Sequence, residues 1–170
     1  PLGIPSPEKP SFLFPVIERL VHHAGHREVE GLLSACLRDL PNRYFRGERR
    51  KYMKSRDIDD YLKKKHRSFV RWIRKCLRED ELFFAQEITD DVVTFVRNNP
   101  EIESGVRQGN KVFVSKIPYN ARQYLVETDP VLKRYYACHC PWARETLIGG
   151  QERVSATFCR CSAGFVKKPW

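Results

Sequence analysis

The sequence predicts an α+β protein in which an N-terminal helical part is followed by a small α+β part that contains paired cysteines. Three observations lead to this fold class. Apolar residues recur at helical spacing through the first hundred residues, a Gly-Asn turn signal then precedes a β-rich run, and four of the six cysteines form two C-x-C doublets. The predicted organisation is a tag remnant or disordered start over 1–10, a helical region over 11–100, and an α+β cysteine-doublet region over 101–170.

The helical region contains recognisable start and stop signals. Ser11 can cap a first helix that Gly25 ends, and Thr89 can cap the last. Asp57 stands at the start of the longest helix and Arg78 at its end, which is the charge order that the helix dipole favours. The helices expected here cover about 12–24, 27–40, 57–78 and 89–98, and a basic connector covers 42–56.

The second region mixes strands with short helices. A β-rich run over 112–117 follows the Gly109-Asn110 turn signal and is closed by Pro118. The stretch RVSATFCRC, over 153–161, predicts a second strand because it is rich in β-forming residues. Short helices are expected over about 121–127, 130–136 and 142–147.

The two doublets are the strongest chemical signal. Cys138 and Cys140 flank His139, and Cys159 and Cys161 flank Arg160. Alternate residues of an extended segment point to one face, so each doublet presents two sulfurs together. Four thiols are the minimum set for a closed tetrahedral thiolate site of the kind that binds zinc. Zinc binding, reduced cysteines lining a pocket, disulfides and thiol catalysis are all open interpretations.

Cysteine chemistry depends on the compartment. The chain shows no secretory leader and no apolar run long enough to cross a membrane, so reduced thiols, a cytoplasmic location and no membrane partner are expected. Cys36 and Cys76 fall on apolar stripes of predicted helices and are expected to be core residues.

Positive charge is concentrated in one segment. Residues 43–75 contain 14 Lys and Arg against 4 Asp and Glu, whereas the rest of the chain is balanced. Such a segment is typical of a polyanion binder, and Tyr44, Phe45 and Tyr52 within it can stack on exposed bases. The favoured interpretation is nevertheless a solvated helix face with a basic connector, because charge runs usually face water. Any polyanion binding is expected to be nonspecific and salt-dependent.

Two long motifs near the end carry a family resemblance. CHCPWARE over 138–145 is followed by FCRCSAGFVKKPW over 158–170, and the similarity covers about 105–170. The chain resembles an uncharacterised, cysteine-rich bacterial family with these motifs. That family is similar to L-2-amino-thiazoline-4-carboxylate hydrolase-like proteins, and its C-terminal part resembles the 4-vinyl reductase domain of small-molecule sensors. Similar proteins continue past KKPW into a further strand pair with another cysteine. This sequence ends at Trp170, so a fold without that strand pair is expected, either through truncation or because the domain is completed in another way.

The resemblance implies a site built from the motif residues. Cys138, Cys140, Cys159 and Cys161 are the expected metal ligands, with zinc as the metal, or else the wall of a pocket. Trp142, Arg144, Glu145 and Phe165 are the expected ligand-binding residues, with Arg144 as the contact for a small anionic molecule. An alternative is that Arg144 pairs with a nearby carboxylate and only stabilises the fold. No catalytic residue can be named.

Two function classes follow. The preferred one is a cytosolic small-molecule-binding or hydrolase-like domain, and the candidate reaction is hydrolysis of a C–N bond in a small cyclic amino-acid-like substrate. The alternative is a non-catalytic, metal-stapled adaptor whose basic helical segment binds nucleic acid or another acidic partner. Dinucleotide, P-loop, H-E-x-x-H and G-x-S-x-G motifs are absent from the sequence.

Overall fold

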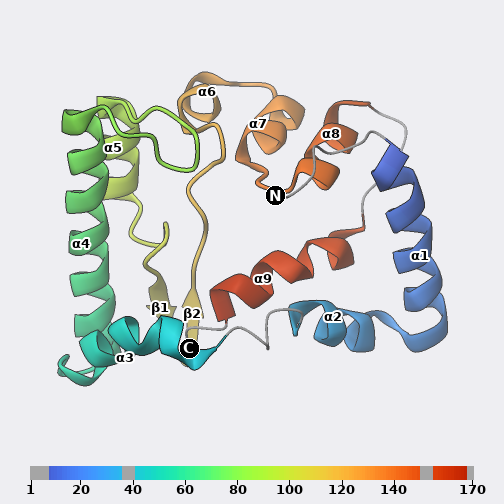
Figure 1. The fold of residues 1–170 in the computed structure, drawn as a ribbon, viewed down its shortest axis with the longest axis horizontal. Helices are drawn as coiled ribbons and strands as arrows, with labels where there is room; N and C mark the ends of the chain where they lie inside the picture. Colours follow the sequence, from blue (N-terminus) through green and yellow to red (C-terminus); the bar gives the residue numbers. More distant parts are fainter. Residues whose placement is uncertain (1–7, 36–40, 150–154, 168–170) are drawn as a thin grey trace. The chain divides into compact units, whose positions relative to one another are not determined.

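The computed structural model describes residues 8–35, 41–149 and 155–167. The chain forms two compact units (Figure 1). Unit 1 contains the described residues up to Gly47 and those from Cys140 onward, and unit 2 is Glu48–His139. Helices dominate and one antiparallel sheet of two strands is present in the described residues, so the predicted α+β fold class is confirmed.

Unit 2 is organised around its longest helix. This helix, α4 (Ile58–Glu79), begins at Asp57, whose side chain accepts a hydrogen bond from the Asp60 backbone N–H at 2.8 Å. It packs against α5 (Asp90–Asn98), which Thr89 caps as expected. Before α4, the stretch expected as a connector contains the 3₁₀ helix η1 (Asn42–Phe45) and the helix α3 (Arg46–Met53). Neither contains a buried residue, so no apolar stripe marks them in the sequence.

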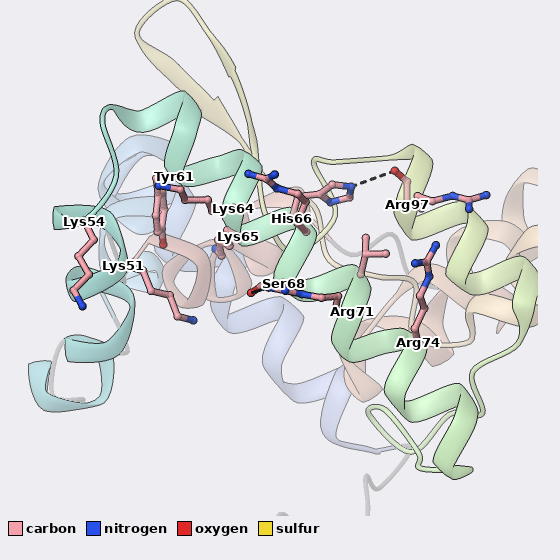
Figure 2. Close-up of a pocket in the computed structure, with 12 residues that line it drawn as sticks. Lys51, Lys54, Tyr61, Lys64, Lys65, His66, Ser68, Arg71, Arg74 and Arg97 are labelled. Atoms are coloured by element: carbon pink, nitrogen blue, oxygen red, sulfur yellow. Dashed lines mark hydrogen bonds between the residues drawn. The ribbon is translucent and has the colours of Figure 1, made fainter.

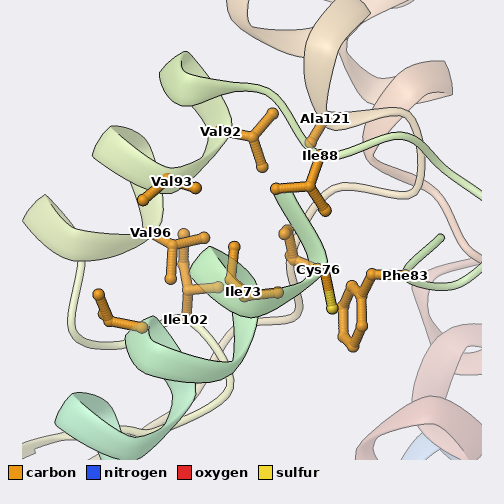
Figure 3. Close-up of a cluster of buried hydrophobic side chains, with 11 residues drawn as sticks. Ile73, Cys76, Phe83, Ile88, Val92, Val93, Val96, Ile102 and Ala121 are labelled. Carbon is orange, nitrogen blue, oxygen red and sulfur yellow. The ribbon is translucent and has the colours of Figure 1, made fainter. Parts of the chain in front are cut away.

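The core of unit 2 lies between α4, α5 and the segments that follow them (Figure 3). Ile73 of α4 and Val92 and Val96 of α5 are completely buried, together with Ile117 and Ala121. Cys76 also lies in this cluster with 1% of its surface exposed, which confirms its expected core role. Burial of such side chains from both helices is what fixes α4 against α5.

The β part of unit 2 is smaller than predicted. Strands β1 (Val106–Gln108) and β2 (Lys111–Phe113) pair through Gln108 and Lys111. Gly109 sits in the connecting turn with φ 63°, a conformation that favours glycine, as the turn signal predicted. The strand expected over 112–117 ends early because Ser115 pairs instead with Ile102 in an isolated parallel bridge. The predicted helices follow as α6 (Ala121–Val126) and α7 (Pro130–Ala137).

Unit 1 is helical throughout its described part. It contains α1 (Glu8–Ala24), α2 (His26–Ser34), η1, α8 (Pro141–Gly149), the 3₁₀ helix η2 (Ala156–Cys159) and α9 (Arg160–Lys167). Gly25 separates α1 from α2 with φ 83°. Residues 8–10 of the expected disordered start are helical, and residues 1–7 lie outside the described ranges. Residues 36–40 of the second predicted helix, Cys36 included, also lie outside them.

The strand predicted over 153–161 is wrong. From Ser155 onward this stretch is η2 followed by α9, and Ser155 accepts a hydrogen bond from the Thr157 N–H as an N-cap. Helix α9 packs along α2, so tertiary packing overrides the β propensity of the segment. In the described parts of the chain, no helix has the length and apolarity needed to cross a bilayer.

Candidate nucleic-acid interface

A cavity of about 830 Å³ runs along α4 in unit 2 (Figure 2). We call it the basic cavity. Helix α4 provides most of its wall, α3 and the turn after it provide two lysines, and the C-terminal part of α5 provides one arginine. The lining residues are Lys51, Lys54, Tyr61, Lys64, Lys65, His66, Arg67, Ser68, Val70, Arg71, Arg74 and Arg97.

The wall of the basic cavity is strongly cationic. Eight of its twelve residues are Lys or Arg, and none is Asp or Glu. The periodicity of α4 produces this separation, because Arg67, Arg71 and Arg74 recur on one face while Ile73 and Cys76 face the core. Lys63, which the basic segment also contains, is exposed but does not line the cavity.

Several of these cations have no counter-ion among the described residues. Lys51 pairs with Glu48 at 2.6 Å and Lys64 with Asp60 at 2.7 Å, whereas Arg71 donates to the Ser68 hydroxyl at 3.2 Å. Within the described ranges, no carboxylate lies within ion-pair distance of Arg67, Arg74 or Arg97. Three guanidinium groups at the cavity are therefore available to an external anion.

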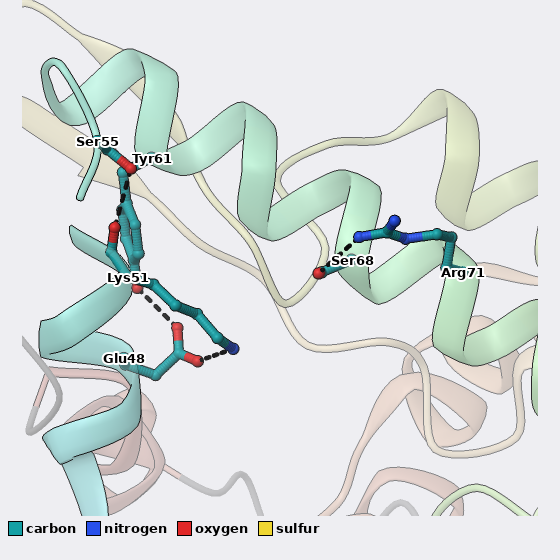
Figure 4. A network of polar contacts seen from close by, with 6 residues as sticks. All are labelled: Glu48, Lys51, Ser55, Tyr61, Ser68 and Arg71. Atoms are coloured by element: carbon teal, nitrogen blue, oxygen red, sulfur yellow. Dashed lines mark hydrogen bonds and ion pairs between the residues drawn. The ribbon is translucent and has the colours of Figure 1, made fainter.

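One carboxylate organises the α3 end of the cavity (Figure 4). Glu48 accepts a hydrogen bond from the Tyr61 hydroxyl at 2.8 Å and another from Lys51 Nζ at 2.6 Å. Partial burial opposes ionisation of Glu48, but these two donors outweigh it and lower the pKa of the carboxyl group. Burial and the Glu48 hydrogen bond raise the pKa of Tyr61, so its hydroxyl stays a donor. The network ties α3 to α4.

Two further contacts shape the cavity wall. Burial lowers the pKa of Lys65, and the carboxylates of Glu48 and Glu103 oppose that shift. His66 Nε2 lies 3.1 Å from the Arg97 carbonyl oxygen. Because a carbonyl only accepts, the histidine Nε2–H is the donor, and this bond joins α4 to the end of α5 that carries Arg97.

Residues of the first doublet make contacts that stabilise the fold. Cys138 caps α7 in an extended conformation, and Pro141 starts α8 as expected. His139 Nε2 donates to the Ile117 carbonyl at 2.6 Å, and its ring packs edge-on against Phe84 and Tyr119. His139 is thus held in unit 2 by structural contacts.

The second doublet is not extended. Cys159 ends η2 and is exposed, whereas Cys161 is half-buried within α9, so the alternation argument for two sulfurs on one strand face is wrong here. Cys138 belongs to unit 2 and the other three thiols belong to unit 1, so neither unit holds the four-thiol set. Across the described residues, no three His, Cys, Asp or Glu side chains are grouped as metal ligands. A zinc site stays a prediction.

The other residues of the second motif are structural where they are described. Phe158 is buried and packs edge-on against Phe14 with ring centroids 5.2 Å apart. Arg160 pairs with Glu30 of α2 at 3.1 Å. Gly164 allows α9 to approach α2, because a Cβ atom there would lie 2.4 Å from the Ser34 carbonyl oxygen. Packing therefore explains part of this motif without a ligand.

The predicted ligand-binding residues lie on α8 and α9. Trp142 and Arg144 are half-buried on α8, and the Arg144 backbone N–H donates to the Cys140 carbonyl at 2.9 Å. The side chains of Glu145 and Phe165 lie outside what the structure describes. A small-molecule pocket at these positions stays a prediction.

Sequence reasoning placed the positive charge correctly but missed the cavity. Tyr61 carries no positive charge, and Arg97 belongs to a helix outside the basic segment. The position of Tyr61, one helical turn before Lys64 and Lys65, could have indicated its place at the cavity, whereas no local pattern indicates Arg97.

No protein-family model, curated protein or solved structure matches this chain.

Proposed function

We propose that unit 2 binds nucleic acid without sequence specificity, through phosphate contacts in the basic cavity. The observation that carries this proposal is a concave wall with eight Lys or Arg residues and no Asp or Glu. A phosphate backbone neutralises such a wall and releases condensed counter-ions, which makes binding favourable at low salt. This is the alternative function class of the sequence analysis, now supported by a specific cavity.

Concavity favours this proposal over a simple solvated face. A solvated run of lysines and arginines pairs with nearby carboxylates or points separately into water, as Lys75 does when it pairs with Glu79 at 3.1 Å. At the basic cavity, cations from α3, α4 and α5 instead surround one space. The small-molecule or hydrolase-like function of the cysteine motifs, and the cytoplasmic location, stay predictions from the sequence.

The proposal is tested by reversing charge inside and outside the cavity. In the cavity variant, Arg67→Glu is combined with Arg71→Glu; in the control, Lys63→Glu is combined with Arg78→Glu. Both variants change the net charge equally and both alter exposed positions of α4, but only the first alters the cavity wall. Binding of a fluorescein-labelled oligonucleotide is followed by fluorescence anisotropy over a range of salt concentrations.

We expect the cavity variant to lose at least about tenfold in affinity, and the control to lose much less. The slope of log K against log salt should fall by about 1.4, because each single-strand phosphate contact contributes about 0.7. Equal losses in both variants would attribute binding to overall charge rather than to the cavity. Absence of binding by the unaltered protein at low salt would refute the proposal.

A further inference from the structure

We infer that the basic cavity accepts a single strand, whose bases stack on Trp72 and Tyr52. This inference rests on the proposed function and specifies its ligand. Both rings belong to unit 2 and are about half exposed, with 49% of Trp72 and 46% of Tyr52 accessible. Exposed aromatic rings beside a cationic groove are the features with which proteins bind single strands regardless of sequence.

Trp72 does not line the basic cavity, but it lies on α4 beside residues that do. It follows Arg71 directly and lies one turn after Ser68, so it shares a helix face with one lining residue and adjoins another. Its ring is held edge-on by Phe83, with centroids 4.9 Å apart, and by Phe69, with centroids 6.0 Å apart. A ring supported in this way loses little freedom when a base stacks on its exposed surface.

Tyr52 does not line the cavity either, but it lies on α3 beside residues that do. Its ring packs edge-on against Tyr61, with centroids 5.6 Å apart, and Tyr61 lines the basic cavity. Lys51 and Lys54, which lie on either side of Tyr52 in the sequence, also line the cavity. Each half-exposed ring is therefore anchored by an aromatic neighbour and accompanied by cavity cations.

The spacing of the rings suits a short run of nucleotides. Tyr61, the ring against which Tyr52 packs, and Trp72 are separated by about 16 Å along the axis of α4, given a rise of about 1.5 Å per residue. A stacked strand advances about 3.4 Å along its axis for each phosphate, so several phosphates fit between these two positions. A duplex keeps its bases stacked within the helix and cannot offer them to Trp72 or Tyr52.

The test compares three probes of equal length: oligothymidylate, an abasic deoxyribose-phosphate strand and a duplex. We expect the unaltered protein to bind oligothymidylate about tenfold more tightly than the abasic strand, since stacking on one side chain is worth about that factor. Trp72→Ala should remove most of this difference and leave abasic binding and the salt slope unchanged. Trp72→Phe should restore most of the affinity, and Tyr52→Ala should have a smaller effect in the same direction.

Leu82→Ala is the matched control, because Leu82 is an exposed apolar side chain of unit 2 that lies outside α3 and α4, the helices that carry the two rings. Its affinity for all three probes should equal that of the unaltered protein. Equal affinity of the unaltered protein for oligothymidylate and the abasic strand, or tighter binding of the duplex, would overturn base stacking and leave phosphate binding intact. Failure to bind any probe would instead refute the proposed function.

Trp72 also packs against Phe69 and Phe83, so its replacement by alanine can disturb the structure as well as base stacking. A second measurement therefore uses the protein without any substitution. The unaltered protein is photocrosslinked to a strand that contains 5-iododeoxyuridine, and the adducts are mapped by peptide mass spectrometry. We expect adducts on the peptides that contain Trp72 or Tyr52. Adducts confined to other peptides would overturn the inference, even if Trp72→Ala weakens binding.

Discussion

Helices α9 and α4 use their distinctive residues in different ways. Helix α9 carries the second cysteine motif, yet its described motif residues Arg160 and Gly164 are engaged in contacts with α2. Helix α4 carries a charge run that was expected to face water, yet Arg67, Arg71 and Arg74 line a cavity. The comparison shows that a specific sequence pattern can have a packing origin, whereas a common pattern can build a binding surface when the fold makes it concave.

The α9–α2 contact and the cavity face of α4 also differ in which substitutions would disturb them. The contact of α9 with α2 depends on the absence of one side chain, because the Gly164 position approaches backbone atoms that cannot rotate away. The cavity face of α4 depends on long side chains that can each be replaced without disturbing the core. Substitutions at α9 should therefore affect stability first, and substitutions on the cavity face should affect binding first.

The largest expected effect is at Gly164. In Gly164→Ala the new Cβ atom would lie 2.4 Å from the Ser34 carbonyl oxygen, so α2 and α9 must separate. We expect unit 1 to lose about 2–3 kcal/mol of unfolding free energy from this overpacking. Urea denaturation followed by far-UV circular dichroism measures the loss.

Gly31→Ala is the control for that experiment. Gly31 lies inside α2, and no atom comes within 4 Å of a Cβ placed there. Alanine should therefore stabilise the helix by about 0.5–1 kcal/mol. If Gly164→Ala were as harmless as Gly31→Ala, the close approach of α9 to α2 would not explain the glycine, and a ligand-related role of the motif would gain support.

A smaller effect is expected where α3 joins α4. Tyr61→Phe removes the hydroxyl that donates to Glu48, and we expect a loss of about 1.5 kcal/mol because a hydrogen bond to a charged group is lost. The folded pKa of Glu48 is below the ordinary value of 4.5, so its stabilising contribution is present above that pH and is lost as the pH falls through the folded pKa. Removing the tyrosine donor raises this pKa toward the ordinary value, so the acid-induced loss should be smaller and should be complete at a higher pH.

Urea midpoints measured from neutral pH down to about pH 3 test this expectation, with Tyr52→Phe as the control. Tyr52 is an exposed aromatic neighbour of Tyr61, and its hydroxyl makes no hydrogen bond to the described residues. Its loss should leave both the midpoint and the pH profile unchanged. Identical profiles for Tyr61→Phe and the unaltered protein would show that Glu48 does not depend on this donor.

Local patterns were sufficient to predict most helices. The caps Asp57 and Thr89 and the glycine at position 25 mark element ends through backbone hydrogen bonds or conformations that are local in sequence. The strand expected over 153–161 failed because packing of α9 on α2 is a long-range interaction. The basic cavity could not be predicted for the same reason, because the packing of α5 against α4 brings Arg97 to it.

The smallest expected effect concerns a second place where the backbone favours glycine. Phe83 and Gln86 exchange backbone hydrogen bonds of 3.0 and 3.1 Å, and the residues between them, Phe84 and Ala85, have φ values of 50° and 60°. Unlike the α9–α2 contact, this turn in unit 2 has no glycine. A left-handed conformation costs alanine about 1 kcal/mol, and the extra freedom of glycine in the unfolded chain offsets about half of that.

We therefore expect Ala85→Gly to stabilise unit 2 by about 0.5 kcal/mol, measured by urea denaturation. The reverse substitution at a comparable φ is the control: Gly109 has φ 63° and no atom within 4 Å of the position a Cβ would take, so Gly109→Ala should destabilise by a similar or larger amount. Opposite signs for the two variants would attribute the effect to backbone conformation alone. A loss of stability in Ala85→Gly would instead mean that packing of the Ala85 methyl group outweighs the backbone strain. A side chain would then stabilise this turn, whereas at Gly164 a side chain would clash with α2.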